Sequence, residues 1–353
     1  MTQEGMRIVD KVERRIQAMI TSIFSVTFFF MAGMGTGLAS NVENPNESNP
    51  ISGHSISLEE ITSADVMARV QMLRDTLELI RFEMGKPLVT PSDAIVTNVH
   101  SHEAYFQALT LYHKADRLAL ELTGSTGFPL EPISLSALAP LHIWKMVNAS
   151  YIRILTIKEE LGLKEKIPER PEDSSTSLTE IGRAIVQANR QLNLLQERHF
   201  SPSDVSQQVL LASQYAKRLL DRFPPSNVPL ETSPLVRGKQ PADVFLRLVQ
   251  CYAILEEIAQ RSRIPVLHLD LPAAHNVGIS RQLYPSDVYD MATLLVSDLA
   301  FFYTQLKKHD SLKPIPYPGR TFPSLVYQQA TVLLHQLKSL EKLVTDDPEW
   351  LSR

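Results

Sequence analysis

The sequence predicts an all-α protein built from a duplicated unit of four amphipathic helices. Three observations support this prediction: one short phrase recurs eight times, an apolar seam with helical spacing follows each copy, and the spacing of the copies repeats after the fourth. The chain has 353 residues, of which 44% are apolar. This is enough for a sizeable core and argues against disorder of the whole chain.

The recurring phrase ends in a Val, Ile or Ala residue, here called the anchor, and has the composition of a helix start. Proline stands three residues before the anchor in five copies, and Asp or Glu stands immediately before it in six. In one copy, Ser201 fits the N-cap, Pro202 the first helical position and Asp204 the third, where a carboxylate accepts free backbone amides. Thr62 and Ser177 are predicted to cap their own helices. The acidic residues are therefore interpreted as caps rather than catalytic carboxylates. The anchors are Val66, Ala104, Ile143, Ile181, Val205, Val244, Val288 and Val326.

An apolar seam follows every anchor. Offsets of 0, +4, +7, +11 and +14 select forty positions, here called the seam positions, and thirty-nine of them are apolar, with Ser150 as the exception. This spacing is typical of the buried side of an α-helix. Eight helices of about 20 residues are predicted. No run with the two-residue alternation of a strand competes with them, so no strand is expected between residues 60 and 345.

The spacing of the anchors predicts two units. Successive anchors lie 38 or 39 residues apart, except for steps of 24 and 44, and anchors four helices apart are offset by 139 to 145 residues. We therefore predict a first four-helix unit over residues 59–199 and a second over residues 200–353. The short step requires an antiparallel or nearly continuous join, whereas the other connections are long enough for parallel neighbours. Paired bundles and a single helical-hairpin solenoid both fit, and the duplication favours the bundles.

The N-terminus has the pattern of a secretory signal peptide over residues 1–39. A polar segment with Arg7, Lys11, Arg14 and Arg15 precedes a stretch over residues 18–39 that has no charge and ends in small residues. The alternative is an uncleaved membrane anchor over the same residues 18–39, because an uncharged stretch of this length can span a bilayer. Either interpretation predicts an exported, periplasmic or otherwise extracytoplasmic body. A polar linker rich in Asn, Ser and Pro follows over residues 40–58.

Composition and motifs exclude several classes of function. The net charge of -4 and the pI near 6.2 argue against sequence-independent nucleic-acid binding. A single cysteine excludes an intrachain disulfide and a cysteine-based metal site, and Cys251 lies at a seam position, where we expect it to be buried and inert. No phosphate loop, zinc-protease motif or nucleophile motif is present. We therefore assign no catalytic, cofactor-binding or metal-binding residue.

Three weaker features have mainly structural interpretations. His100 and His102 form a close pair beside Glu103 at a helix start and offer part of a metal site, but side chains at such positions usually face water or bond to backbone. Aromatic residues directly after five anchors are expected to pack against incoming loops, with a ligand groove as the alternative. Asn189, Arg190, Gln191 and Asn193 are interpreted as a solvated face of the fourth helix. The five aromatic residues are Tyr105, Trp144, Phe245, Tyr289 and Tyr327.

The resulting hypothesis is an exported, non-enzymatic interaction or scaffold protein of the cell envelope, which binds another protein or an envelope component and carries no metal or cofactor. The alternative is a helical bundle that binds a small ligand, and an enzyme without a recognisable motif comes third. Buried charge or clustered histidine beside a cavity would favour ligand binding or catalysis, whereas an exposed apolar groove would favour the scaffold.

Overall fold

The computed structural model confirms the all-α class, with eight α-helices among the residues that it describes. Each helix begins three residues before its anchor, as the recurring phrase predicts. The described residues are 61–87, 95–128, 133, 135–168, 175–196, 200–223, 233–270, 283–307, 312–347 and 349–352. The helices are α2 (Ser63–Glu83), α3 (Ser101–Thr123), α4 (Pro140–Glu160), α5 (Leu178–Leu195), α6 (Pro202–Leu220), α7 (Pro241–Ser262), α8 (Pro285–Thr304) and α9 (Pro323–Asp346), with short 3-10 turns η2 (Leu135–Ala137) and η3 (Trp350–Ser352).

Residues 1–60 lie outside the described part of the chain. They include the predicted signal peptide or anchor, residues 1–39, and the predicted linker, residues 40–58. Within the residues that are described, none of the helices combines the length and the apolar character that crossing a bilayer requires.

The helix starts are capped as the sequence predicts. Thr62, Ser177 and Ser201 each accept a hydrogen bond from the backbone N–H three residues later, at 3.3 to 3.4 Å. All six acidic residues before the anchors accept the backbone N–H of their N-cap residue at 2.6 to 2.9 Å, which confirms their capping role. These six are Asp65, Glu103, Glu180, Asp204, Asp243 and Asp287.

The seam positions form the core. All forty are at most 2% exposed, including the single polar one. Ser150 satisfies its hydroxyl by donating to the Met146 carbonyl at 2.8 Å. Cys251 is fully buried as predicted, and burial raises the pKa of its thiol to about 12.

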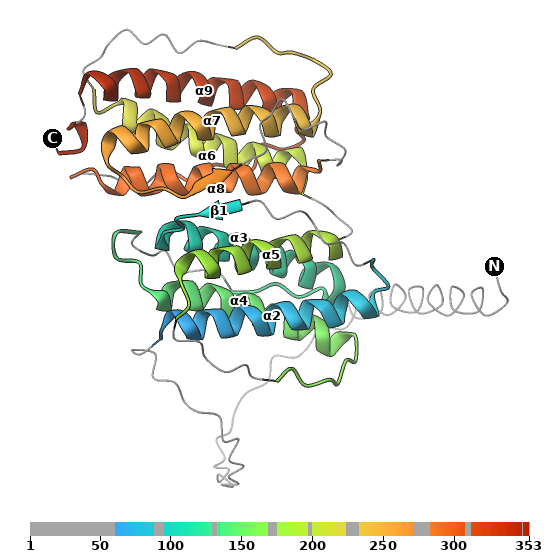
Figure 1. Ribbon diagram of the computed structural model, residues 1–353. Coiled ribbons are helices and arrows are strands. Elements are labelled where there is room, and N and C mark those ends of the chain that lie inside the picture. Colours follow the sequence, from blue (N-terminus) through green and yellow to red (C-terminus); the bar gives the residue numbers. More distant parts are fainter. Residues whose placement is uncertain are drawn as a thin grey trace, which may run out of the picture. The chain divides into compact units, whose positions relative to one another are not determined.

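The helices pack as two sets, which we call the first helix set (α2–α5) and the second helix set (α6–α9) (Figure 1). In the first set, α2 and α3 each contact both α4 and α5. In the second set, α6 and α7 each contact both α8 and α9. The order of neighbours is therefore the same in both sets.

The four helices of the second set run parallel. Ser206 and Ser213 of α6 donate to Gln329 and Gln336 of α9 at 2.7 and 2.6 Å, so contacts advance together along the two helices. A small hollow at one end of the set is lined by the first residue and the anchor of every helix. These residues are Pro202, Val205, Pro241, Val244, Pro285, Val288, Pro323 and Val326.

Parallel packing also holds for α3 and α5 of the first set. Asn189 donates to the Gln107 carbonyl at 3.1 Å, and Gln196, farther along α5, donates to the Lys114 carbonyl at 2.9 Å. Parallel neighbours require a connection that returns along about 30 Å of helix. About nine extended residues cover that distance, and the segments before and after α4, residues 124–139 and 161–177, are both longer than this.

Helices α3 and α8 join the two sets and run antiparallel. His102 at the start of α3 contacts Asp298 in the second half of α8, whereas Lys114 farther along α3 contacts Asp290 near the start of α8. Because α5 runs parallel to α3 and α6 runs parallel to α8, whereas α3 and α8 are antiparallel, the chain reverses between α5 and α6, in agreement with the short step between their anchors.

Two three-residue strands, β1 (Ile95–Thr97) and β2 (His268–Asp270), also connect the sets. They form an antiparallel pair between the segment before α3 and the segment after α7. The expectation of no strand between residues 60 and 345 is therefore wrong for these two segments, because three residues are too few to show an alternating pattern. The register pairs Ile95 with Asp270, Val96 with Leu269 and Thr97 with His268.

Candidate functional site

The contact between α3 and α8, here called the α3–α8 seam, holds buried charged side chains. Lys114 is fully buried, and its Nζ lies 2.6 Å from Asp290 Oδ1. His102, Glu103 and Asp298 are at most 2% exposed. Charged groups are rarely buried to this extent unless they are paired, hydrogen-bonded or bound to a metal. The α3–α8 seam is therefore the region to examine for function.

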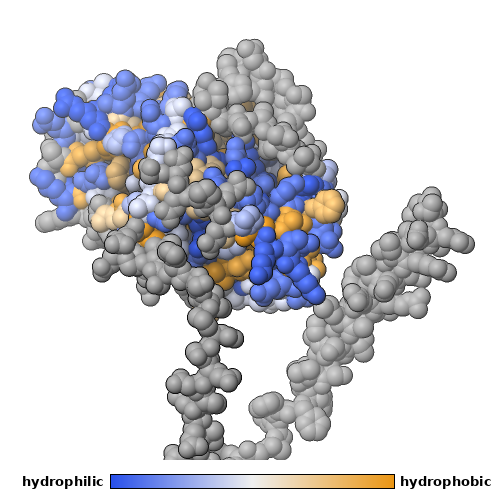
Figure 2. Space-filling model, turned by 60° about the horizontal axis from the view of Figure 1, so that its bottom comes forward, coloured by the Kyte–Doolittle hydropathy of each residue, from blue (hydrophilic) through white to orange (hydrophobic). Residues whose placement is uncertain are grey.

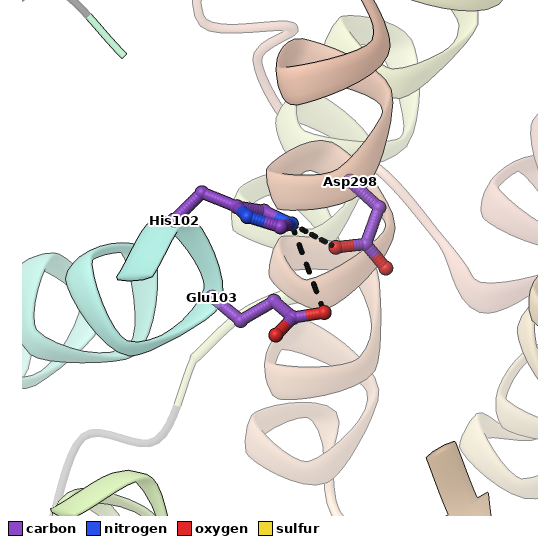
Figure 3. A group of neighbouring side chains, drawn as sticks. All are labelled: His102, Glu103 and Asp298. Carbon is purple, nitrogen blue, oxygen red and sulfur yellow. Dashed lines mark hydrogen bonds and ion pairs between the residues drawn. The ribbon is translucent and has the colours of Figure 1, made fainter. Parts of the chain in front are cut away.

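His102, Glu103 and Asp298 form a compact cluster, in which α3 supplies the first two residues and α8 the third (Figure 3). His102 Nε2 lies 3.2 Å from Asp298 Oδ1 and 3.7 Å from Glu103 Oε1. One ligand atom from each residue lies within 4.8 Å of the other two. We call this group the His–Glu–Asp cluster.

Local structure fixes the first two members of the cluster. Glu103 is the capping carboxylate of α3, so its Oε2 accepts the His100 backbone N–H at 2.6 Å. Its Oε1 accepts the backbone N–H of Leu267, which directly precedes β2. The His102 ring stacks on Phe301 of α8, with 4.0 Å between ring centroids and 6° between planes. The carboxylate and the imidazole are thus held in one orientation.

Burial dominates the electrostatics of the His–Glu–Asp cluster. It lowers the pKa of His102 to about 4, so the imidazole is neutral at pH 7. It raises the pKa of Glu103, although the contact with His100 opposes this shift. It raises the pKa of Asp298 to about 8, against an opposing effect of the Tyr252 hydroxyl. The cluster contains two buried carboxyl groups and no positive charge of its own.

A cavity of about 190 Å³ opens beside the cluster, between α5 of the first helix set and α8 of the second. Its walls are mainly apolar, and Gly182 lets α5 approach closely, because a Cβ at that position would lie 2.8 Å from Val99. Residues from both sets and from the segments around β1 and β2 complete the walls. The apolar lining consists of Val96, Val99, Val186, Phe245, Leu267, Leu269, Leu283, Met291 and Leu294.

Polar groups gather at several points of the same cavity. Asn189 is 2% exposed and donates its amide to the Gln107 carbonyl, but its Oδ1 has no hydrogen-bond partner among the described residues. Glu103, Asp287 and Asp290 add carboxylates, and Arg190 adds a single guanidinium. A mostly apolar cavity with a few convergent polar groups is the usual form of a small-ligand site.

Two interpretations from the sequence are corrected by these positions. His102 is buried rather than facing water, whereas His100 keeps 35% of its side chain exposed. Asn189 lies against α3 and the cavity rather than on a solvated face of α5. In both cases the covering element comes from elsewhere in the chain, which the pattern of a single helix cannot reveal.

The aromatic residues after the anchors have mixed surroundings. Tyr289 stacks on Phe200 at 4.1 Å, and Lys239 of the loop before α7 lies 4.5 Å from the Tyr327 ring centroid, as the loop-packing interpretation predicts. Phe245 instead lines the cavity, as the alternative interpretation anticipated. Sequence reasoning did not single out Asp298, Lys114 or Met291.

No protein-family model, curated protein or solved structure matches this chain.

Proposed function

We propose that this chain is a non-enzymatic binding protein that holds a small, largely apolar molecule in the cavity beside the α3–α8 seam. The observation that carries the proposal is the cavity of about 190 Å³ with Asn189 in its wall, a residue that is 2% exposed and whose Oδ1 has no hydrogen-bond partner in the described part of the chain. Buried charge beside a cavity favours the ligand-binding alternative over the scaffold. The scaffold hypothesis itself predicts no such cavity.

The volume sets the size of the ligand. A cavity of about 150 Å³ accommodates benzene. The cavity beside the α3–α8 seam is somewhat larger, at about 190 Å³. It therefore suits one aromatic ring or a short branched chain with one polar substituent. Phe245, Met291 and Leu294 offer apolar contacts to the ring or chain.

The polar lining sets the chemical class. Glu103, Asp287 and Asp290 contribute carboxyl oxygens, and Asn189 contributes the Oδ1 acceptor. Arg190 is the one cationic side chain among the lining residues, and Lys114 pairs with Asp290 from outside the lining. An acceptor-rich wall favours a ligand that donates hydrogen bonds and carries positive charge. We therefore propose a small primary amine with an aromatic or aliphatic body.

Export of the protein remains part of the proposal. It is supported by the charge-free stretch over residues 18–39 that follows a basic segment. A ligand-binding body outside the cytoplasm would act as a carrier or a sensor of a small molecule in its surroundings.

Three compounds of the same shape test the class of ligand. The full-length protein is titrated by calorimetry with 2-phenylethylamine, 2-phenylethanol and phenylacetate. We expect the amine to bind most tightly, the alcohol more weakly and the carboxylate least, because the acceptor-rich wall repels an anion. Equal binding of all three, or none, contradicts the proposal.

A cavity-filling variant locates the binding. Val186 lines the cavity and is half-buried, so Val186→Phe should reduce amine affinity at least tenfold. Val249 of α7 is also half-buried but lies outside the cavity lining, and Val249→Phe should leave the affinity unchanged. A loss of binding in both variants, or in neither, would place the amine elsewhere.

A second candidate function, protein binding as the sequence suggested, is supported by exposed apolar side chains on the second helix set. The loop before α7 lies along α9, since Ser324 Oγ accepts from the Lys239 N–H and Gln328 donates to the Ser233 carbonyl. Apolar patches between hydrophilic residues are also visible in one view of the surface (Figure 2). The exposed side chains on this loop and around the start of α9 are Leu235, Val236, Tyr317, Phe322 and Leu325.

A further inference from the structure

The His–Glu–Asp cluster has the dimensions of a metal site. Zinc bonds to imidazole nitrogen and carboxylate oxygen are about 2.0–2.2 Å long, so two ligands of a tetrahedral ion stand about 3.4 Å apart. The observed separations of 3.2 Å from His102 Nε2 to Asp298 Oδ1 and 3.7 Å to Glu103 Oε1 lie on either side of that value. The third separation, between the ligand oxygens of Glu103 and Asp298, is at most 4.8 Å, so a modest side-chain movement would place all three atoms around one ion.

A second observation points to a missing partner. Asp298 is fully buried, and its Oδ2 has no hydrogen-bond partner among the described residues. A buried carboxyl oxygen without a hydrogen-bond partner lowers the stability of the folded protein. A cation bound between the two carboxylates would remove this unfavourable contribution.

We propose that His102, Glu103 and Asp298 bind one divalent transition-metal ion of the zinc, manganese or iron(II) class. One imidazole and two carboxylates are the donor set that these ions share. Three protein ligands leave at least one coordination position for water or another small molecule. The proposal replaces the sequence-based expectation of a metal-free protein, and it does not depend on the amine binding proposed above.

Neighbouring groups hold the ligand side chains of the cluster in place. The backbone N–H groups of His100 and Leu267 orient the Glu103 carboxylate, and stacking on Phe301 orients the His102 ring. Cys251 is buried at a seam position of α7 and bonded to the Ala330 carbonyl at 3.6 Å, so it offers no thiolate to the ion.

An entry path lies next to the cluster. A surface hollow is lined by His100, Glu256, His268 and Leu267, and Leu267 also contacts Glu103. His268 Nδ1 lies 3.2 Å from Glu256 Oε1 at the rim, and the half-exposed His100 ring lies 6.1 Å from the His102 ring. A metal ion can approach through these groups before it reaches the buried ligands.

Zinc binding to the full-length protein tests the assignment after removal of bound metal with a chelator. We expect one tightly bound Zn²⁺ per chain by calorimetry, and X-ray absorption of the bound ion should show nitrogen and oxygen ligands with one imidazole and no sulfur. Asp298→Asn keeps the shape of the side chain and should weaken Zn²⁺ binding at least a hundredfold. His102→Gln should have an effect of similar size.

A matched control and two contrary results complete the test. His113 is exposed on the same helix, so His113→Gln should leave Zn²⁺ binding unchanged. The absence of stoichiometric zinc in the parent protein overturns the proposal. Binding that survives Asp298→Asn, or a bound ion with two or more imidazoles, also overturns it, because the ion would then lie at the surface histidines. Circular dichroism of each variant establishes that the fold is kept.

Discussion

The packing within each helix set differs in chemistry from the packing between the sets. Inside the sets, forty seam positions are at most 2% exposed, and all but Ser150 are apolar. Between the sets, the α3–α8 seam buries Lys114, Glu103 and Asp298 and borders a cavity. Apolar seams stabilise the sets, whereas buried charges are expensive and are kept where they serve recognition, specificity or function.

The same contrast appears in two helices that are each the second of their set. Glu103 of α3 and Asp243 of α7 both cap their helix, at 2.6 and 2.8 Å from the N-cap nitrogen. The Asp243 side chain is 37% exposed and pairs with Lys239, whereas Glu103 is fully buried beside His102. Glu103 therefore caps its helix as Asp243 does, but it also makes buried contacts because α3 packs against α8.

The largest effect is expected inside a helix set. Val205→Asp places a carboxylate at a seam position that is 2% exposed and lies among the prolines and anchors at the start of the second helix set. The free energy of unfolding should fall by about 5 kcal/mol, enough to abolish cooperative folding. Urea denaturation followed by circular dichroism measures this. A loss below about 1 kcal/mol would show that the seam tolerates charge and that the contrast with the α3–α8 seam is false.

Breaking the ion pair of the α3–α8 seam should have the next largest effect. Lys114→Met leaves the Asp290 carboxylate without its cationic partner and should lower the free energy of unfolding by about 3 kcal/mol. The double variant Lys114→Met with Asp290→Leu should recover most of that loss, because no unpaired charge remains. Urea denaturation of the single and double variants measures both free energies of unfolding. If the double variant is as unstable as the single one, packing rather than charge accounts for the effect.

Stability of the metal-free protein should fall as pH rises from about 6.5 to about 8. The pKa of Asp298 is about 8 in the folded protein, above the unfolded value of about 3.9. Between these values only the folded protein keeps the proton on Asp298, so the free energy of unfolding falls as pH rises towards 8. The pKa of His102 is about 4, below its unfolded value of about 6.5, so His102 affects stability only at lower pH. The change is on the order of 1 to 2 kcal/mol. Thermal melts from pH 6.5 to pH 8 should show the fall in the parent protein and a flatter profile in Asp298→Asn. Equal profiles would mean that Asp298 is already ionised at pH 6.5.

The smallest effects concern exposed caps and pairs. Ser201→Ala removes the cap oxygen of α6 and should cost about 1 kcal/mol. Lys239→Met removes a partly exposed partner of Asp243 and should cost less than about 1 kcal/mol. Denaturation midpoints of the two variants measure both. If Lys239→Met lowers the free energy of unfolding more than Lys114→Met does, the ion pair of the α3–α8 seam is less important for stability than the surface pair, which contradicts the comparison.

The sequence predicts the helices well because their signals are local. Ser201, Pro202 and Asp204 lie within one turn, and each seam is a pattern within one helix. The His–Glu–Asp cluster joins His102 to Asp298 across 196 residues, so no local pattern contains it. The cavity likewise forms only where α3, α5 and α8 meet, and the parallel direction of neighbouring helices depends on connections whose paths the sequence leaves open.

Methionine methyl groups give the most direct test of the claim that binding occurs beside the α3–α8 seam. Met291 is 5% exposed and lines the cavity, whereas Met67 and Met146 lie in the first helix set outside its lining. In full-length protein labelled at the methionine methyl groups, titration with 2-phenylethylamine should shift the Met291 resonance in the NMR spectrum and leave Met67 and Met146 unchanged. A saturable shift confined to methionines other than Met291, or no shift at all, would contradict the account.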